Sequence, residues 1–468
     1  MPAIDPSNAR EALAYFSSWL GFRRDYLRVP GIQAAALLGD EIVLDVAYGI
    51  ADIDTGKPLR TDHLFRVASH SKTFTATAIF QLLERGRLRL DDEVGAYVPS
   101  LGDAGSALAT VTIRELLAHA GGVVRDGADG DHWQLRGPFP DGERLEAITL
   151  EQGASVTPEN ASFKYSNIGY SLLGQVIERA SGQTYAAYVQ EHILDVLGLA
   201  HTGPELPTDR SGDLTAGHSA LAYAPERVTI EHIDTRAMAS ATGFFSTARD
   251  LVAYFAAHFL GDERVLSDRS KRAMQQRQWQ TGTDPQGGAY ALGLSLTPIG
   301  ERTLIGHGGG YPGHITSSVA DVHDRLAISV LTNAIDGPAQ ECVLAAVHLL
   351  DLAAKLLRPA DGPDLARFAG RFADLWGVLD IAVLGGRLWM LTPTDANPAA
   401  EAVELTVVDD HTLRIVGGSG YGSAGEPVSY TFHDDGTVAS LRAGSGVTRW
   451  PLDAFRLPGK VTTASTSG

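Results

Sequence analysis

The stretch FRVASHSKTFTATAIFQLLERGRLRL, residues 65–90, places a serine and a lysine three positions apart at the start of an apolar segment with helical periodicity. On a helix, positions i and i+3 share a face, so Ser69 and Lys72 are predicted to be neighbours. A serine hydroxyl is a weak nucleophile, and a lysine whose pKa is lowered by burial can act as its base. The apolar residues around Lys72 predict such burial, and Gly86 fits the end of the helix.

The N-terminus of this helix could also stabilise negative charge. Free backbone N–H groups and the positive end of the helix dipole would stabilise an oxyanion that forms on a carbonyl attached to Ser69. The alternative is an ordinary helix start, because roughly one S-x-x-K sequence is expected by chance in a chain of this length. The motif by itself therefore does not decide the function.

Two later segments add polar residues in a recognisable order. The segment FKYSNIGYSLLGQVIE, residues 163–178, places Tyr165, Ser166 and Asn167 in a loop just before a predicted helix. The segment TLIGHGGGYPGH, residues 303–314, places His307, Gly308 and Gly309 at the end of a predicted strand. Taken alone, a Tyr or a His in such a setting is most often a core residue with satisfied hydrogen bonds.

Together, the three segments resemble the motifs of the serine β-lactamase-like and penicillin-binding-protein-like family. That family includes class C β-lactamases, DD-peptidases, D-aminopeptidases and related esterases, and the resemblance covers about residues 31–357. The S-x-x-K motif matches Ser69 and Lys72, and the Y-x-N motif matches Tyr165 and Asn167. The third motif, K-T-G in lactamases, stands here as His307-Gly308-Gly309.

The resemblance implies a role for each matched residue. Ser69 would attack the substrate carbonyl to give an acyl-enzyme, while Lys72 and Tyr165, titrating as one coupled pair, would pass the proton to the leaving group and later activate water. Asn167 would bind the amide of the acyl side chain. His307 would lie across the cleft from Ser69.

The glycines after His307 complete the predicted site. The resemblance also implies that Gly308, Gly309 and Gly310 contact the substrate, and that the backbone N–H groups of Ser69 and Gly310 form the oxyanion hole. No cofactor and no metal are predicted. His307 and His314 could be metal ligands seven residues apart, but the glycine-rich spacer and the lack of a nearby carboxylate disfavour that alternative.

The histidine in the third motif bears on the substrate. A neutral His cannot provide the permanent cation with which a Lys would bind a substrate carboxylate, which weakens the case for a β-lactam. The resemblance implies an amide or peptide bond, with D-amino-acid selectivity open, because H-x-G is the pattern of D-aminopeptidases and some DD-peptidases in the family. A carboxylesterase or transacylase with the same machinery is the alternative. A catalytically silent binding protein is a third hypothesis, opposed by the complete set of Ser69, Lys72 and Tyr165.

Composition limits the partners. A formal net charge of −18 disfavours nucleic acid and anionic membranes, and no run reaches the roughly 18 apolar residues that a bilayer span needs. We expect a small amide, peptide or ester substrate and leave a homo-oligomer open. The single cysteine excludes an internal disulfide, and the N-terminal sequence predicts a cytoplasmic protein unless a signal peptide has been removed.

The pattern along the chain predicts an α+β fold with two domains. Strands flank a helical middle region, which predicts an antiparallel sheet built from both ends of a catalytic domain, residues 1–360, and packed on a helical cluster. A linker at 358–364 precedes short alternating strands, which predict an all-β, lipocalin-like barrel at 365–458.

The loop at 417–426 could narrow the cleft or be a plain hairpin, and 459–468 is predicted to be a disordered tail. The loop with Asp126, Asp129 and Asp131 lacks calcium-loop spacing and is predicted to be solvated, with a lid as the alternative.

Overall fold

The computed structural model describes residues 5–284, 287–354, 364–417, 423–444 and 446–457. Its contacts divide the chain into two compact units. The first unit spans Leu27–Val343, and the second combines residues 2–26 with residues 344–468. The predicted linker, except Asp364, and the predicted tail lie outside the described residues, as do residues 418–422 of the predicted cleft loop. The predicted domain boundaries remain a prediction.

The first unit is built on a nine-stranded antiparallel sheet with the order β3-β2-β1-β13-β12-β11-β10-β9-β8. β1 pairs with β13 along its length, with Ile32 opposite Thr332, so strands from the two ends of the unit lie side by side within the sheet, as predicted. Gly39, at φ +63°, makes the tight turn between β1 and β2. The strands are β1 (Gly31–Leu38), β2 (Glu41–Asp52), β3 (Lys57–Pro58), β8 (Trp279–Gln280), β9 (Ala289–Tyr290), β10 (Ser295–Ile299), β11 (Arg302–Tyr311), β12 (His314–Asp321) and β13 (Leu326–Thr332).

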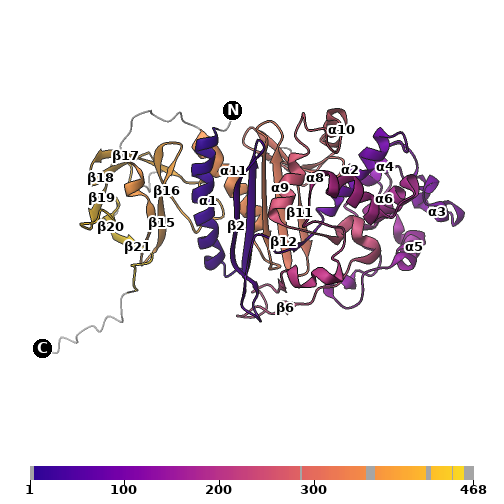
Figure 1. Ribbon diagram of the computed structural model, residues 1–468, viewed down its shortest axis with the longest axis horizontal. Helices are drawn as coiled ribbons and strands as arrows, with labels where there is room; N and C mark the ends of the chain where they lie inside the picture. Colours follow the sequence, from indigo (N-terminus) through magenta and orange to yellow (C-terminus); the bar gives the residue numbers. More distant parts are fainter. Residues whose placement is uncertain (1–4, 285–286, 355–363, 418–422, 445, 458–468) are drawn as a thin grey trace. The chain divides into compact units, whose positions relative to one another are not determined.

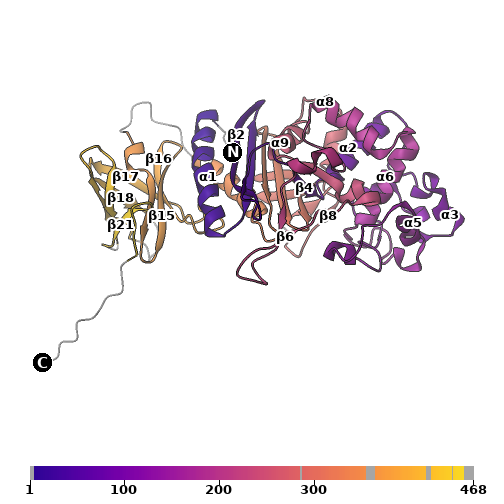
Figure 2. The same cartoon turned by 60° about the horizontal axis from the view of Figure 1, so that its bottom comes forward.

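The helices of the first unit form a cluster beside this sheet (Figures 1 and 2). α9 packs against β1, β12 and β13, while α2 packs against α6. All residues of α2 from Ser71 to Leu82 are buried, which confirms the predicted buried helix. The helices are α2 (Ser71–Glu84), α3 (Pro99–Asp103), α4 (Ile113–Leu117), α5 (Gly142–Leu150), α6 (Asn167–Ser181), α7 (Tyr185–Val189), α8 (Asp195–Leu197), α9 (Ala248–Ala256) and α10 (Asp268–Met274).

Two small sheets lie outside the main sheet. The first joins β4 (Phe65–Ala68) to β7 (Phe244–Ser246), and the second joins β5 (Gly217–His218) to β6 (Thr229–Ile230). β4 packs on β11 and β12 and leads directly to Ser69. The serine therefore follows a short strand that is held between the helical cluster and the main sheet.

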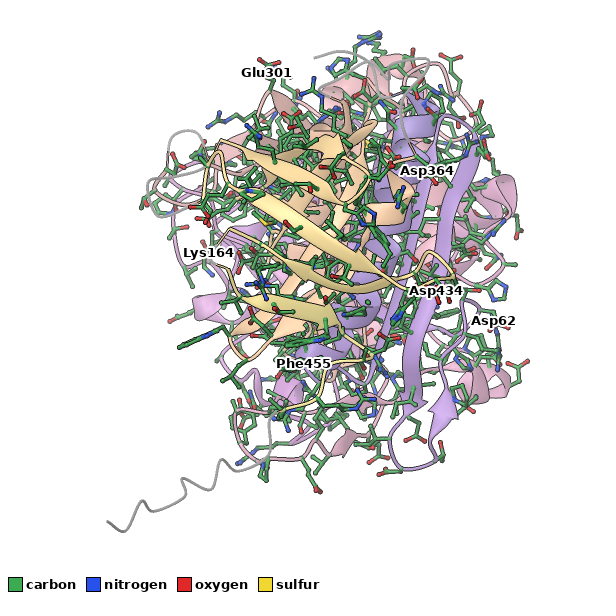
Figure 3. The ribbon with its side chains drawn as sticks, turned by 90° about the vertical axis from the view of Figure 1, so that its left-hand side faces the viewer. Asp62, Lys164, Glu301, Asp364, Asp434 and Phe455 are labelled. Atoms are coloured by element: carbon green, nitrogen blue, oxygen red, sulfur yellow. The ribbon has the colours of Figure 1, made fainter. Side chains whose placement is uncertain are left out.

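The second unit is a closed antiparallel barrel of eight strands together with α1 (Pro6–Tyr26). Figure 3 looks onto the barrel, where Phe455 stacks on Trp450 of the last strand. The strands are β14 (Gly370–Asp374), β15 (Gly377–Leu384), β16 (Arg387–Leu391), β17 (Val403–Asp409), β18 (Thr412–Val416), β19 (Pro427–Phe432), β20 (Val438–Arg442) and β21 (Thr448–Pro451). The predicted C-terminal barrel is confirmed, and α11 (Ala339–Ala354) runs across the division between the units.

The grouping of α1 differs from the sequence-based organisation, which placed this helix in the first domain. α1 packs on β15, and the indole of Trp19 donates a hydrogen bond of 2.9 Å to the backbone oxygen of Pro393. Tyr15 donates a hydrogen bond of 2.8 Å to Asp380, whose carboxylate also binds Arg371. These contacts join the helix to the barrel, and helical periodicity alone does not identify the partner of an apolar face.

Candidate active site

Ser69 occupies a sharp turn between β4 and α2. The preceding residue, Ala68, has a left-handed backbone with φ +44°, which a residue with a Cβ rarely adopts. The Ser71 hydroxyl donates a hydrogen bond to the carbonyl of Ala68 and accepts one from the amide of Phe244, so this backbone is held from two sides. Ser69 is half-buried, and its own N–H donates no hydrogen bond within the described part of the chain.

Lys72 lies one turn into the helix and is fully buried. Its Nζ is 3.2 Å from Ser69 Oγ, 2.7 Å from Asn167 Oδ1 and 2.7 Å from the backbone oxygen of Ala241. The predicted contact of Ser69 with Lys72 is therefore present. Two of the three partners of Nζ are carbonyl oxygens, which can only accept hydrogen bonds.

The protonation of Lys72 follows from this environment. Burial lowers the pKa of Lys72 well below its usual value; Arg125 lowers it further, and Asp126 opposes the shift. A neutral amine would donate its two hydrogens to Asn167 and Ala241 and direct its lone pair toward the Ser69 hydroxyl. The arrangement can therefore accept the serine proton without moving any heavy atom.

Tyr165 contacts the same serine oxygen. Its hydroxyl donates a hydrogen bond of 2.9 Å to Ser69 Oγ, and its ring centroid is 4.8 Å from Lys72 Nζ. Burial raises the pKa of Tyr165, which keeps the phenol protonated. The sequence left open which member of the pair would be the base; the pKa shifts favour the lysine amine and leave the tyrosine as a proton donor.

Asn167 begins α6, and Ser166 caps that helix by accepting a hydrogen bond from the amide of Gly169. The side-chain oxygen of Asn167 binds Lys72, and its amide nitrogen donates a hydrogen bond of 2.6 Å to Asp126. The asparagine thus holds the lysine in this structure. Its predicted contact with a substrate amide remains a prediction.

His307 lies on β11 and is buried, with both ring nitrogens engaged. Nδ1 is 2.6 Å from the carbonyl of Gly308 and must carry the hydrogen, because a carbonyl only accepts; Nε2 therefore accepts from the Tyr290 hydroxyl at 3.1 Å. Burial lowers the pKa of His307 to about 3. The imidazole is neutral at ordinary pH, in agreement with the absence of a cation inferred for the third motif.

The three glycines after His307 differ in what surrounds them. A Cβ on Gly309 would lie 2.1 Å from the carbonyl oxygen of Val67 and 2.6 Å from the Thr316 hydroxyl, so only glycine allows β11 to approach β4 here. Gly308 and Gly310 have no such close neighbour and are exposed. The close approach brings the third motif beside the strand that leads to Ser69.

Sequence reasoning missed the importance of two residues around Tyr165. The ring of His119 is tilted against that of Tyr165, with 4.2 Å between the two ring centroids, and His119 Nδ1 accepts a hydrogen bond from the amide of Ser166. Asp126, expected in a solvated loop, has a side chain only 13% exposed and binds Asn167. No local pattern indicates either contact, because both join segments far apart in the sequence.

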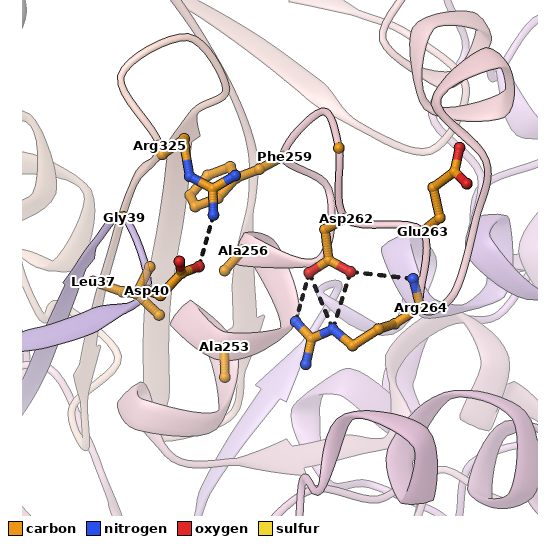
Figure 4. A pocket seen from close by; sticks show the side chains of 11 residues that line it. Leu37, Gly39, Asp40, Ala253, Ala256, Phe259, Asp262, Glu263, Arg264 and Arg325 are labelled. Atoms are coloured by element: carbon orange, nitrogen blue, oxygen red, sulfur yellow. Dashed lines mark hydrogen bonds and ion pairs between the residues drawn. The ribbon is translucent and has the colours of Figure 1, made fainter.

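Other features of the described residues lie apart from these contacts. The cavity in Figure 4, of 540 Å³, is bounded by the β1–β2 turn, the end of α9 and Arg325, and none of the predicted site residues lines it. Among the described residues, no three Asp, Glu, His or Cys side chains gather as metal ligands. In the same residues, no helix is both long and apolar enough to cross a bilayer.

Known proteins resemble this chain in sequence. A family model described as Beta-lactamase matches residues 22–353. Beta-lactamase-like protein 2 of Dictyostelium discoideum is 32% identical over 231 residues, which are 47% of this chain and 41% of that protein. The chain therefore spans about two fifths of the length of this curated relative.

Solved structures share the fold. The octameric penicillin-binding protein homologue from Pyrococcus abyssi superposes with a TM-score of 0.65 at 21% sequence identity. The alignment covers 92% of this chain and 98% of the homologue. The D-amino acid amidase from Ochrobactrum anthropi SV3 has a TM-score of 0.62 at 23% identity and covers 73% of this chain and 99% of its own. At these identities, the likeness establishes the architecture alone.

Proposed function

Because the chain belongs to the beta-lactamase family, whose members are hydrolases, we propose that it is a serine hydrolase that cleaves an amide or peptide bond through an acyl-enzyme on Ser69. One observation carries the proposal. Ser69 Oγ contacts both the Nζ of a fully buried lysine, at 3.2 Å, and a tyrosine hydroxyl, at 2.9 Å. Burying a lysine amine beside a serine hydroxyl costs free energy, and an ordinary helix start does not require it.

The contacts suggest the order of proton transfers. Neutral Lys72 accepts the Ser69 proton while Oγ forms a bond to the substrate carbonyl carbon, and the resulting oxyanion is stabilised by the N–H groups of Ser69 and Gly310. Tyr165 then gives its proton to the leaving nitrogen and regains one from the Lys72 ammonium, as the bond from carbon to nitrogen breaks. In deacylation, water attacks the ester carbon and returns its proton to Ser69 through the same groups.

The bond that is cleaved is proposed from the third motif. A neutral His307 offers no cation for a substrate carboxylate, which disfavours a β-lactam. A D-amino acid amidase shares the fold, and we propose a small amide or peptide, with a D-residue on the acyl side, as the substrate. Ester hydrolysis would use the same nucleophile and oxyanion hole, so a carboxylesterase or transacylase is the alternative that the experiment below distinguishes.

Intact-protein mass tests this function directly. Wild type and Ser69→Ala would be incubated with a p-nitrophenyl ester and with the p-nitroanilides of D-alanine and L-alanine, while chromophore release is followed. We expect an acyl adduct and turnover of the D-anilide that disappear in Ser69→Ala. Ester turnover alone would select the esterase, and a wild type that behaves like Ser69→Ala would leave a binding protein.

We also propose a homo-oligomer, because an octameric homologue shares the fold. Light scattering coupled to size-exclusion chromatography measures the mass of the particle; a monomer of 49.7 kDa at micromolar concentration would contradict this proposal. A cytoplasmic location remains a prediction.

A further inference from the structure

Asp126 belongs to an acidic loop but is itself almost covered, with 13% of its side chain exposed. Its Oδ1 accepts hydrogen bonds from Asn167 Nδ2 at 2.6 Å and from Trp133 Nε1 at 3.0 Å. Its Oδ2 lies 3.2 Å from Arg125 Nε. Within the part of the chain that the structure describes, the other acids of the loop make no such contact, and Asp129 accepts a hydrogen bond from the backbone amide of Asp131.

The contact of Asp126 with Asn167 has a geometric consequence. A carboxylate only accepts hydrogen bonds, so the NH₂ end of the asparagine amide must face Asp126, and its oxygen is then directed toward Lys72, 2.7 Å away. A flipped amide would place its NH₂ group against the amine and leave a buried donor without an acceptor. The backbone supports the same arrangement, because the carbonyl of Arg125 accepts the amide N–H of Asn167 at 2.9 Å.

We propose that Asp126 is a positioning residue, which fixes the Asn167 amide and thereby holds the Lys72 amine with its lone pair toward Ser69. This inference rests on the proposed function, since it concerns the base of that reaction. Among the described residues, the hydrogen-bond partners of the Asp126 carboxylate are Arg125, Trp133 and Asn167, and Ser69 is not one of them. It acts through Asn167, and Trp133 in turn fixes the carboxylate.

The charge of Asp126 gives the proposal a second, independent readout. Asp126 raises the pKa of Lys72 against burial and against Arg125, so its removal should lower that pKa further. The other titratable groups that act on or contact Lys72 are Tyr165, Tyr170, His119 and His307. All four remain neutral at ordinary pH, since burial raises the pKa of both tyrosines and lowers the pKa of both histidines.

The experiment compares Asp126→Asn, Asp126→Ala and Trp133→Phe with the control Asp129→Asn. The probe is a fluorophosphonate, which transfers a phosphonyl group to Oγ and releases fluoride, and the labelling rate is followed by intact mass from pH 5 to 10. Asp126→Asn removes the charge but keeps an acceptor for Asn167. Asp126→Ala removes both, and Trp133→Phe removes the indole hydrogen bond while it keeps an aromatic ring.

We expect the acid limb of the rate profile to move roughly one pH unit lower in Asp126→Asn, because neutral Lys72 then persists to lower pH. The plateau rate should fall about 10- to 100-fold in Asp126→Ala and less in Asp126→Asn and Trp133→Phe. Asp129→Asn should match wild type in both respects. Should Asp126→Ala fail to fold, the isosteric Asp126→Asn still provides the test.

Two outcomes would count against the proposal, and they are distinguishable. If wild type labels at Ser69 but Asp126→Asn and Asp126→Ala keep both its acid limb and its plateau, Asp126 only stabilises the loop and the positioning role is wrong. If wild type does not label at Ser69 at all, the proposed function fails, and the inference fails with it.

Discussion

The Tyr165 hydroxyl donates its hydrogen bond to Ser69 Oγ, the same atom that Lys72 Nζ contacts. Tyr165→Phe removes this donor while the ring keeps its contacts with His119 and Lys72. We expect kcat for the anilide to fall about 10²- to 10⁴-fold, as for loss of a general acid, with an unchanged melting temperature. Tyr97→Phe, whose hydroxyl binds Asp92 instead, is the matched control and should retain full activity.

The pH dependence of fluorophosphonate labelling at Ser69 reports the protonation state of the Lys72 amine. The base is active when deprotonated, so the rate should rise with pH through the pKa of Lys72 and reach its plateau well below 10.5, because burial lowers that pKa. Lys72→Ala should label about 10²- to 10⁴-fold more slowly and lose this limb. The half-exposed Lys57, changed to Ala, serves as the control. A wild-type rate that rises only near the ordinary lysine pKa would contradict a buried amine base.

Acid should destabilise the protein through His307. Its folded-state pKa of about 3 lies below the ordinary value of 6.5, so between these values the unfolded chain binds more protons, and stability falls as pH drops from 6.5 toward 3. The slope from one such histidine is at most about 1.4 kcal/mol per pH unit. Melting temperatures of His307→Asn should therefore fall less steeply over this range than those of wild type. The exposed His323, changed to Asn, should reproduce the wild-type slope.

Gly309→Ala should destabilise the first unit. The added Cβ would meet the Val67 carbonyl oxygen at 2.1 Å, and a backbone atom cannot move aside as the end of a flexible side chain can. We expect a loss of about 1–3 kcal/mol in the free energy of unfolding, measured by urea titration. Gly310→Ala is the matched control, because its nearest neighbour, at 3.6 Å, is an ordinary contact. Equal stability of the two variants would contradict the close approach of β11 to β4.

Local patterns predicted the parts of the site that depend on short spacing. The three-residue interval of Ser69 and Lys72 places both side chains on one helical face, and the apolar neighbours of Lys72 predicted its burial. Alternation and turn residues likewise predicted the barrel. These features depend on periodicity, which a single sequence shows directly.

Features that depend on tertiary contacts were out of reach. Three aspartates in nine residues resemble a solvated loop, and only the approach of Asn167 and Trp133 makes Asp126 different from Asp129. The contact of His119 with the Tyr165 ring likewise joins segments that are far apart in the sequence. The partner of α1 could not be deduced either, because an amphipathic face does not encode which surface covers it.

The pairing of α1 with the barrel has a consequence for the order of biosynthesis. The helix is translated before the larger unit, but Pro393, which accepts the Trp19 hydrogen bond, is translated only after the whole of Leu27–Val343. The larger unit can fold while the helix still awaits its partner strands. In a nascent chain arrested before the barrel, the indole of Trp19 would therefore lack its hydrogen-bond acceptor, Pro393. The helix would then be accessible to the chaperones that bind newly made polypeptides.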